Sequence, residues 1–115
     1  MSTLEVRHEN DDGRTTIRLT GELDISTADE LGRVLSELDA PGGPAGIRLD
    51  LSGLRFMDST GLRLIITSDL RLRRDGRELR LVPGPEQVQR VFRLALLEER
   101  LVFEPSAIVG GEEAT

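Results

Sequence analysis

The chain has 115 residues and a formal net charge of −6, with no cysteine and one histidine, His8. Its length fits one domain with a single modest core, while its residue content excludes disulfides, thiolate metal sites and histidine clusters. The acidic net charge argues against nucleic acid binding. The sequence has neither an apolar run of about 18 residues nor a signal peptide, and we therefore expect a cytoplasmic protein without membrane insertion.

The first elements predicted are two strands joined by a tight turn. Apolar and polar residues alternate over 4–8 and over 15–19, which is the period of a half-buried strand. Residues 9–13 between them are rich in Asn, Asp and Gly and suit a hairpin connection. Residues 21–24 are expected to form a loop.

A helix is predicted next. Thr27 and Glu30 have the spacing of a capping box, in which each side chain bonds the other residue's backbone amide. The residues that follow form one apolar stripe, Ala28, Leu31, Val34, Leu35 and Leu38. Two prolines and two glycines at 41–44 end this helix.

The middle of the chain predicts a strand, a short loop and a second helix. Residues 47–51 alternate at the strand period, and 52–57 break that alternation. Asp58 or Ser59 is expected to cap the helix, because a short side-chain oxygen can accept from first-turn amides. The helix has an apolar stripe of Leu62, Ile65, Ile66 and Leu70, and it ends at Asp75-Gly76.

The last third predicts a strand at 78–82, a helix that begins near Pro85, and a strand at 101–103. The inward-facing residues of that helix are expected to be Val88, Val91, Phe92 and either Ala95 or Leu96. We expect the domain to span 1–104, with 105–115 as a C-terminal tail that is either a short helix or disordered.

The alternation of strands and helices predicts an α/β fold of one domain, a mixed sheet of four or five strands with three to four helices packed on it. Right-handed crossovers make the central strands parallel, while the N-terminal hairpin is antiparallel. Loops at the carboxyl ends of parallel strands gather functional groups. We therefore expect Asp24, Asp58, Ser59 and Thr60 to lie exposed side by side.

Adjacent hydroxyls at the start of a helix suit a phosphorylation switch. Unpaired backbone amides and the helix dipole should tolerate a phosphate on Ser59 or Thr60. The simpler interpretation is that Asp58 and Ser59 only cap the helix, which is compatible with a phosphoacceptor role. The local basic run of Arg71, Arg73, Arg74, Arg77 and Arg80 is interpreted as a solvated helix end.

Enzyme functions are disfavoured. A nucleophilic Ser59 would need a base, and the single histidine lies in an N-terminal strand. Asp58-Ser59-Thr60-Gly61 has one residue too many for the turn of an aspartic protease, which also needs a second carboxylate. The chain contains no lysine, so it has no phosphate-binding loop that depends on one.

Three motifs follow one another along the chain: Gly21-Glu22-Leu23-Asp24, Leu49-Asp50-Leu51-Ser52-Gly53-Leu54 and Phe56-Met57-Asp58-Ser59-Thr60-Gly61-Leu62. In this order and at these separations they resemble the anti-sigma factor antagonists of the STAS domain family. The resemblance extends from about residue 4 to 103, and 57–62 is its most specific part. The sequence departs from the family pattern mainly at its C-terminal end, where Gly110-Gly111 makes a full helix doubtful.

The resemblance implies a partner-switching protein with no cofactor and no catalytic activity of its own. In that family the unphosphorylated form binds an anti-sigma factor that is also an ATP-dependent Ser/Thr kinase, which frees a sigma factor. Phosphorylation ends the binding, and a PP2C-type phosphatase resets the cycle. Carried over by position, Ser59 is the phosphoacceptor, and the partner-binding residues are Asp24, Ser26, Asp58, Ser59, Thr60, Gly61 and Leu62. We expect the free protein to be a monomer.

A second function is compatible with the same fold. A STAS domain can also serve as a scaffold that does not switch, as a subunit of a transport system or of a stress-sensing assembly. The exposed hydroxyls expected at Ser59 and Thr60 favour the phosphorylation switch.

Overall fold

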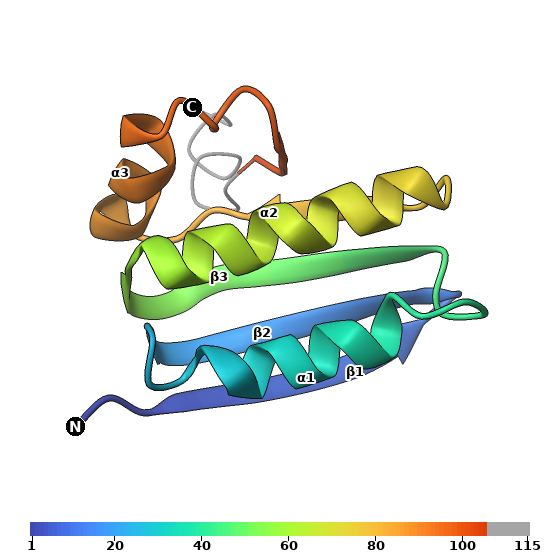
Figure 1. Ribbon diagram of the computed structural model, residues 1–115, viewed down its shortest axis with the longest axis horizontal. Coiled ribbons are helices and arrows are strands. Elements are labelled where there is room, and N and C mark those ends of the chain that lie inside the picture. Colours follow the sequence, from blue (N-terminus) through green and yellow to red (C-terminus); the bar gives the residue numbers. More distant parts are fainter. Residues whose placement is uncertain (106–115) are drawn as a thin grey trace, which may run out of the picture.

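The computed structural model describes residues 1–105, and over that range the chain forms five strands and three helices around one sheet (Figure 1). The elements in chain order are β1 (Leu4–Asp11), β2 (Arg14–Leu23), α1 (Ala28–Leu38), β3 (Gly46–Met57), α2 (Ser59–Arg74), β4 (Glu78–Val82), α3 (Glu86–Leu94) and β5 (Val102–Phe103). The strands lie in the order β1-β2-β3-β4-β5. Only the β1–β2 pair is antiparallel among these neighbours, and the other pairs are parallel. The predicted α/β fold with an N-terminal hairpin is therefore confirmed.

The predicted C-terminal tail and the domain boundary at residue 104 stay predictions. Residues 106–115, and with them most of the segment for which a short helix or disorder was expected, lie outside the described residues. Among the helices formed within residues 1–105, none has the length and hydropathy that a membrane crossing requires.

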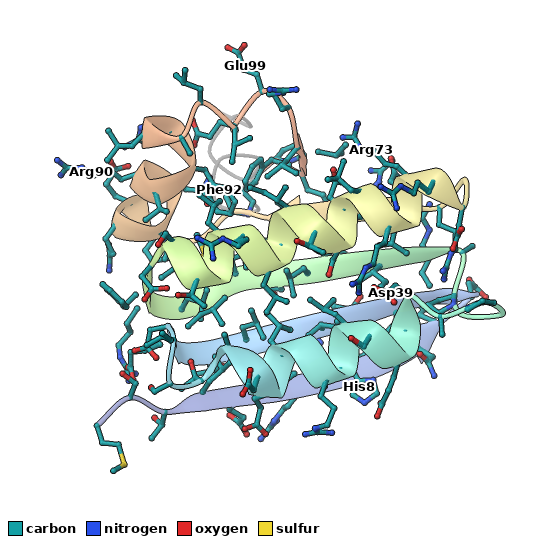
Figure 2. The ribbon with its side chains drawn as sticks, viewed as in Figure 1. His8, Asp39, Arg73, Arg90, Phe92 and Glu99 are labelled. Atoms are coloured by element: carbon teal, nitrogen blue, oxygen red, sulfur yellow. The ribbon has the colours of Figure 1, made fainter. Side chains whose placement is uncertain are left out.

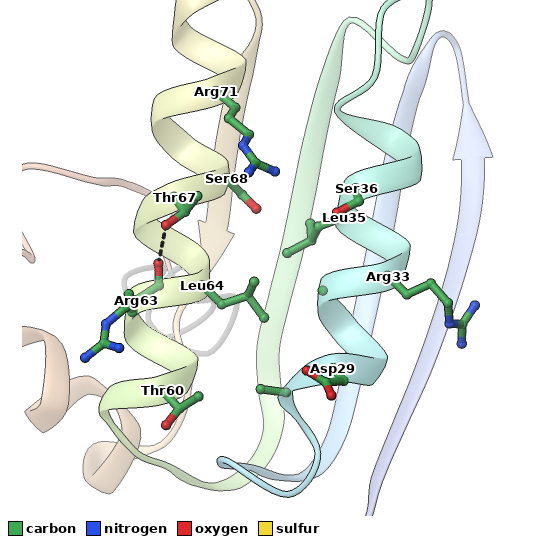
Figure 3. A pocket seen from close by; sticks show the side chains of 12 residues that line it. Asp29, Arg33, Leu35, Ser36, Thr60, Arg63, Leu64, Thr67, Ser68 and Arg71 are labelled. Carbon is green, nitrogen blue, oxygen red and sulfur yellow. Dashed lines mark hydrogen bonds between the residues drawn. The ribbon is translucent and has the colours of Figure 1, made fainter.

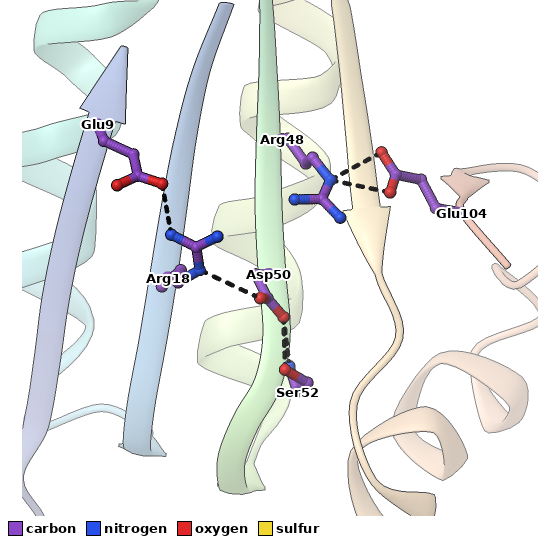
Figure 4. Close-up of polar contacts among 6 residues, drawn as sticks. All are labelled: Glu9, Arg18, Arg48, Asp50, Ser52 and Glu104. Atoms are coloured by element: carbon purple, nitrogen blue, oxygen red, sulfur yellow. Dashed lines mark hydrogen bonds and ion pairs between the residues drawn. The ribbon is translucent and has the colours of Figure 1, made fainter. Parts of the chain in front are cut away.

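The two faces of the sheet differ in character. Helices α1 and α2 lie against one face (Figure 1), and the core between them is built from alternate residues of β2 and β3, Ile17, Leu19, Leu23, Ile47, Leu49 and Leu51. The opposite face carries charged side chains, where Arg18 pairs with Glu9 at 2.6 Å and Arg48 pairs with Glu104 at 2.9 Å (Figure 4). This arrangement explains the period-two pattern, because each strand has one apolar and one polar face.

The β1–β2 turn is shorter than the residues 9–13 expected from sequence. Asp12 and Gly13 alone form it, with φ of 52° and 79°, as a two-residue hairpin turn of the primed type demands. Asn10 and Asp11 belong to the ladder and pair with Thr15 and Arg14.

Strands β2 and β3 extend further than predicted, so the loop expected at 21–24 and the break expected at 52–57 were wrong. Residues 21–23 continue β2, and 52–57 continue β3 through two register shifts. Each shift inserts an extra residue on β3 and reverses which residues face the core. The strict alternation of apolar and polar residues is therefore lost over this part of the strand. At Gly53 a side chain is excluded, because a Cβ would lie 2.5 Å from the carbonyl oxygen of Leu19.

The capping box predicted for α1 was wrong. Thr27 precedes the helix, but its side chain makes no capping hydrogen bond. Its hydroxyl instead donates to the carbonyl of Glu22 at 2.8 Å and accepts from the amide of Asp24 at 3.0 Å. Thr27 therefore fastens the loop between β2 and α1.

Two predicted apolar stripes needed correction. Leu70 of α2 is exposed, and the buried face of that helix continues instead through Ser68, Asp69 and Leu72. Helix α3 ends at Leu94, so neither Ala95 nor Leu96 faces inward. Beyond it, Leu96 has a φ of 60° and is 82% exposed, because the chain turns sharply out of the helix.

Arg77 is not part of a solvated helix end. Its guanidinium is mostly buried and donates to the backbone carbonyls at the end of α1 and in the following loop, Leu38, Asp39, Ala40 and Pro44. The last carbonyls of a helix have no partner within it and carry partial negative charge. Arg77 thus joins the α2–β4 connection to the end of α1.

Candidate functional site

The proposed site lies where β2 and β3 end side by side. Leu23 pairs with Met57 in the parallel ladder, and the amide of Asp58 donates to the carbonyl of Leu23 at 3.2 Å. Asp24 and Asp58 each follow directly after these paired residues. The structure therefore brings together the two loops that the sequence analysis expected to form one surface.

Asp58 caps α2. Its Oδ1 atom accepts from the amides of Thr60 at 2.9 Å and Gly61 at 3.3 Å, while its carbonyl accepts from the amide of Leu62 at 3.1 Å. Ser59 is the first residue of the helix and is exposed, whereas Asp58 and Thr60 are half-buried. Of the two predicted capping residues, Asp58 has that role, and the Ser59 side chain is left accessible.

The Asp24 carboxylate organises its own loop. One oxygen accepts from the hydroxyl of Ser2, and the other accepts from the amide of Ser26 at 2.9 Å and the hydroxyl of Ser26 at 2.7 Å. The hydroxyls of Ser2 and then Ser26 hold the pKa of Asp24 below its ordinary value. An ionised Asp24 thus fixes the position of Ser26 beside the start of α1.

Glu22 and Gly21 hold the N-terminal segment next to this loop. The amide of Glu22 donates to the carbonyl of Thr3 at 2.9 Å, and the amide of Thr3 donates to Glu22 Oε1 at 2.9 Å. Gly21 has a φ of +115°, and a Cβ on it would lie 2.3 Å from the carbonyl oxygen of Thr3. The backbone amide of Thr3 and the guanidinium of Arg55 lower the pKa of Glu22. Sequence reasoning missed the role of residues 2 and 3, since nothing local marks it.

Two residues predicted to contact a partner lie behind this surface. Gly61 is buried, and a Cβ on it would come within 3 Å of the side chains of Leu23 and Met57. Leu62 is 8% exposed and belongs to the core. Both residues position α2 against the ends of β2 and β3, while Asp24, Ser26, Asp58, Ser59 and Thr60 keep some exposure.

Two exposed apolar side chains, which the sequence analysis did not single out, flank the site. Ile25 in the β2–α1 loop is 79% exposed, and Phe56 near the end of β3 is 47% exposed. Partly exposed aromatic and aliphatic side chains of this size are frequent anchors in protein interfaces. The exposure of Phe56 follows from the extension of β3, in which Leu54 and Met57 face the core.

An open groove runs between α1 and α2 and reaches Thr60 at one end (Figure 3). Its volume is about 550 Å³, its lining includes the apolar side chains of Leu35 and Leu64, and Leu64 lies against Gly32 of α1. Within residues 1–105, no cluster of three or more His, Cys, Asp or Glu side chains has the geometry to hold a metal ion. The site therefore consists of hydroxyls, carboxylates and apolar surface.

Comparison with known proteins gives a consistent result. The family model described as "Mlab, STAS domain" matches residues 6–104. The chain is 28% identical over 96 residues to the anti-sigma-B factor antagonist of Staphylococcus aureus, covering 84% of this chain and 88% of that protein. An anti-sigma factor antagonist from Mycobacterium paratuberculosis has the same fold, with a TM-score of 0.82, 23% identity and coverage of 91% and 88% of the two chains.

The fold is also that of the anti-sigma factor antagonist SpoIIAA in its unphosphorylated form, with a TM-score of 0.77, 22% identity and 96% of both chains covered. The phosphorylated form of the Bacillus protein matches with a TM-score of 0.71, 20% identity and coverage of 96% and 100%. Because the family model covers nearly the whole described chain, this protein belongs to the STAS domain family.

Proposed function

We propose that this protein is an anti-sigma factor antagonist that phosphorylation at Ser59 switches off. The unphosphorylated form binds an anti-sigma factor Ser/Thr kinase and releases a sigma factor, phosphorylation ends that binding, and a PP2C-type phosphatase restores it. The observation that carries the proposal is the exposed Ser59 at the first position of α2, beside the loop of Asp24. The similarity to anti-sigma factor antagonists supports the role.

Charge explains how one phosphate could act as a switch. It adds about −1.5 to −2 charges at neutral pH, next to Asp58 and at the strand end that pairs with the one before Asp24. An interface that buries Ser59 would have to desolvate this added charge against a partner surface with no cation placed to match it, at a cost on the order of 2–5 kcal/mol. Since each 1.4 kcal/mol is about tenfold, affinity would fall by roughly 30-fold to several thousand-fold.

The cap on α2 leaves fewer free backbone amides for a phosphate on Ser59 than the sequence suggested. Free backbone amides at the helix start were expected to relieve part of the phosphate charge. The amides of Thr60 and Gly61 instead bind the Asp58 carboxylate, and the amide of Leu62 binds its carbonyl. A phosphate on Ser59 would therefore sit beside an existing anion that already uses these donors.

No change of fold is needed for such a switch. SpoIIAA in its phosphorylated form and in its unphosphorylated form both share the fold of this chain. In that protein, phosphorylation is thus compatible with the fold. We propose the same here, because Ser59 is already exposed at the surface.

We propose no catalytic role for this chain, and ATP would be bound by its partner. In the backbone ladder of the hairpin, His8 pairs with Ile17, six residues before the end of β2. At about 3.3 Å per residue that is roughly 20 Å from the strand end beside Ser59, too far for a general base. A cytoplasmic location and a monomeric free form remain part of the proposal.

The alternative, a scaffold that does not switch, shares every feature of the fold. It requires no accessible hydroxyl at the start of α2, whereas the exposed Ser59 favours the phosphorylation switch.

The decisive experiment incubates the protein with ATP and candidate anti-sigma factor kinases and maps phosphate by mass spectrometry. Phosphate on Ser59, with loss of kinase binding in a pull-down of the same sample, would support the proposal. Ser59→Ala is the matched control and should remain unmodified and bound. Absence of phosphate with every kinase, together with stable binding to a transporter subunit, would favour the scaffold.

A further inference from the structure

The start of α2 offers few free backbone donors to a phosphate on Ser59. The amides of Thr60, Gly61 and Leu62 are all bonded to Asp58. To use the first two, the phosphate would have to displace the carboxylate of a half-buried residue. A positive charge that pairs with the phosphate would therefore come from a side chain.

Arg63 is in the right position to be that counterion. It follows Ser59 by four residues on α2, and residues four apart on a helix lie on the same face, with Cβ atoms about 6 Å apart. Long side chains on helices also lean toward the N-terminus. In Figure 3, Arg63 extends from the side of α2 that faces away from α1 and bends toward the end of the helix where Thr60 lies.

Arg63 is also uncommitted, unlike its neighbours. The nearby Arg55 is paired with Glu22, and the two other arginines of the α1–α2 groove, Arg33 and Arg71, pair with Glu30 and Asp39. Arg63 is exposed and forms no ion pair with any residue in the range 1–105. It can turn to a new anion without giving up an existing contact.

We propose that Arg63 is the counterion of phosphorylated Ser59, which it binds through a hydrogen-bonded ion pair along one turn of α2. This inference rests on the proposed function, since it concerns the state that phosphorylation creates. Guanidinium groups bind phosphate oxygens in charge-assisted hydrogen bonds, often two at a time. The pair holds the phosphate against the helix and stabilises the phosphorylated free protein.

The test uses the full chain with phosphoserine placed at position 59 by genetic encoding, so that no kinase is needed. The ³¹P resonance is titrated with pH in this protein and in the same protein carrying Arg63→Gln. An ion pair between residues four apart favours the doubly charged phosphate, so its loss should raise the pKa of the phosphate by about 0.2–0.4. Raising the salt to about 1 M should shrink the difference between the two proteins.

Arg74→Gln is the matched control. It removes the same charge from the same helix, and Arg74 is exposed and forms no ion pair with any described residue. It lies 15 residues after Ser59, roughly 22 Å along the helix, where screening at physiological salt suppresses its influence.

A raised phosphate pKa in Arg63→Gln, with Arg74→Gln like the parent protein, would support the inference. An unchanged pKa in Arg63→Gln, or equal changes in both variants, would overturn it. The proposed function fails separately, if the protein with phosphoserine at 59 binds the anti-sigma factor kinase as tightly as the unmodified chain. That binding result leaves the titration fully interpretable.

Discussion

The amide of Asp58 donates to the carbonyl of Leu23 at 3.2 Å, which ties the end of β3 to the end of β2 immediately before α2. This contact places the acidic loop of Asp24 beside the residue that we propose as the phosphoacceptor. The register of the two strands supports the same arrangement, because Leu23 and Met57 are buried and paired.

Substitutions of Ser59 should show whether negative charge at this position is what weakens binding to the kinase. Ser59→Ala should leave the fold intact, block phosphorylation and preserve binding to the kinase, because it removes an exposed hydroxyl without adding charge. Ser59→Asp should weaken binding, though less than a phosphate, since it adds one charge and fewer oxygens. Titration calorimetry with the purified kinase measures the affinity of each variant. Equal affinities for the Ala and Asp variants would contradict the charge argument.

Asp58 should stabilise the protein as a helix cap. Asp58→Ala should lower the free energy of unfolding by about 1 kcal/mol, because the amides of Thr60 and Gly61 lose their acceptor. Asp58→Ser should retain most of that stability, since serine caps helices well without a charge. Urea denaturation followed by circular dichroism compares the two. Equal destabilisation by both substitutions would show that charge, and not capping, is what Asp58 provides.

Arg77 should matter for stability although it lies far from the site. Arg77→Ala leaves the carbonyls of Leu38, Asp39 and Pro44 without their donor, and we expect a loss of about 2 kcal/mol in the free energy of unfolding. Arg74→Ala, at an exposed position of α2, should change it by less than about 0.5 kcal/mol. Thermal and chemical denaturation would measure both values, and similar losses would refute the role given to Arg77.

The contacts of Asp24 should make the loop sensitive to acid. Its pKa is lowered in the folded protein, chiefly by the hydroxyl of Ser2 and then by Ser26. A folded-state pKa below the unfolded one contributes stability that is complete above the unfolded pKa, near 4, and is lost as the pH falls through the folded pKa. NMR titration of the carboxyl carbon should show the pKa of Asp24 rising in Ser2→Ala. No change in that variant would mean that Ser2 does not hold the carboxylate in solution.

Much of this architecture follows from periodicity. The hairpin, the three helices and the parallel central strands were predictable, because each buries one face and so repeats at its own period. The cap by Asp58 was predictable for a related reason, since it depends on residues two and three positions away. The closeness of the Asp24 and Ser59 loops followed from the parallel order of β2 and β3.

The features that were missed depend on contacts between distant residues. Two extra residues in β3 break its alternation, so the strand extension toward Met57 has no periodic signal. The hydroxyl of Thr27 bonds to the backbone of Glu22 and Asp24 instead of capping α1. The guanidinium of Arg77 donates to the carbonyl of Leu38, a residue that precedes it by 39 positions. Nothing local in the sequence distinguishes such a contact from a solvated side chain.

Gly21 should be essential for holding the N-terminal segment against the site. Gly21→Ala places a Cβ 2.3 Å from the carbonyl oxygen of Thr3, at a φ of +115° that side chains rarely adopt, so we expect a loss of about 2–4 kcal/mol in unfolding free energy. Gly76→Ala is the matched control, since Gly76 also has a positive φ, +73°, but open space around it. It should cost only about 1 kcal/mol. Hydrogen exchange at the amides of Glu22 and Thr3 should become faster in Gly21→Ala alone. Equal exchange rates and equal losses of stability in the two variants would show that backbone conformation, and not the contact with Thr3, makes Gly21 necessary.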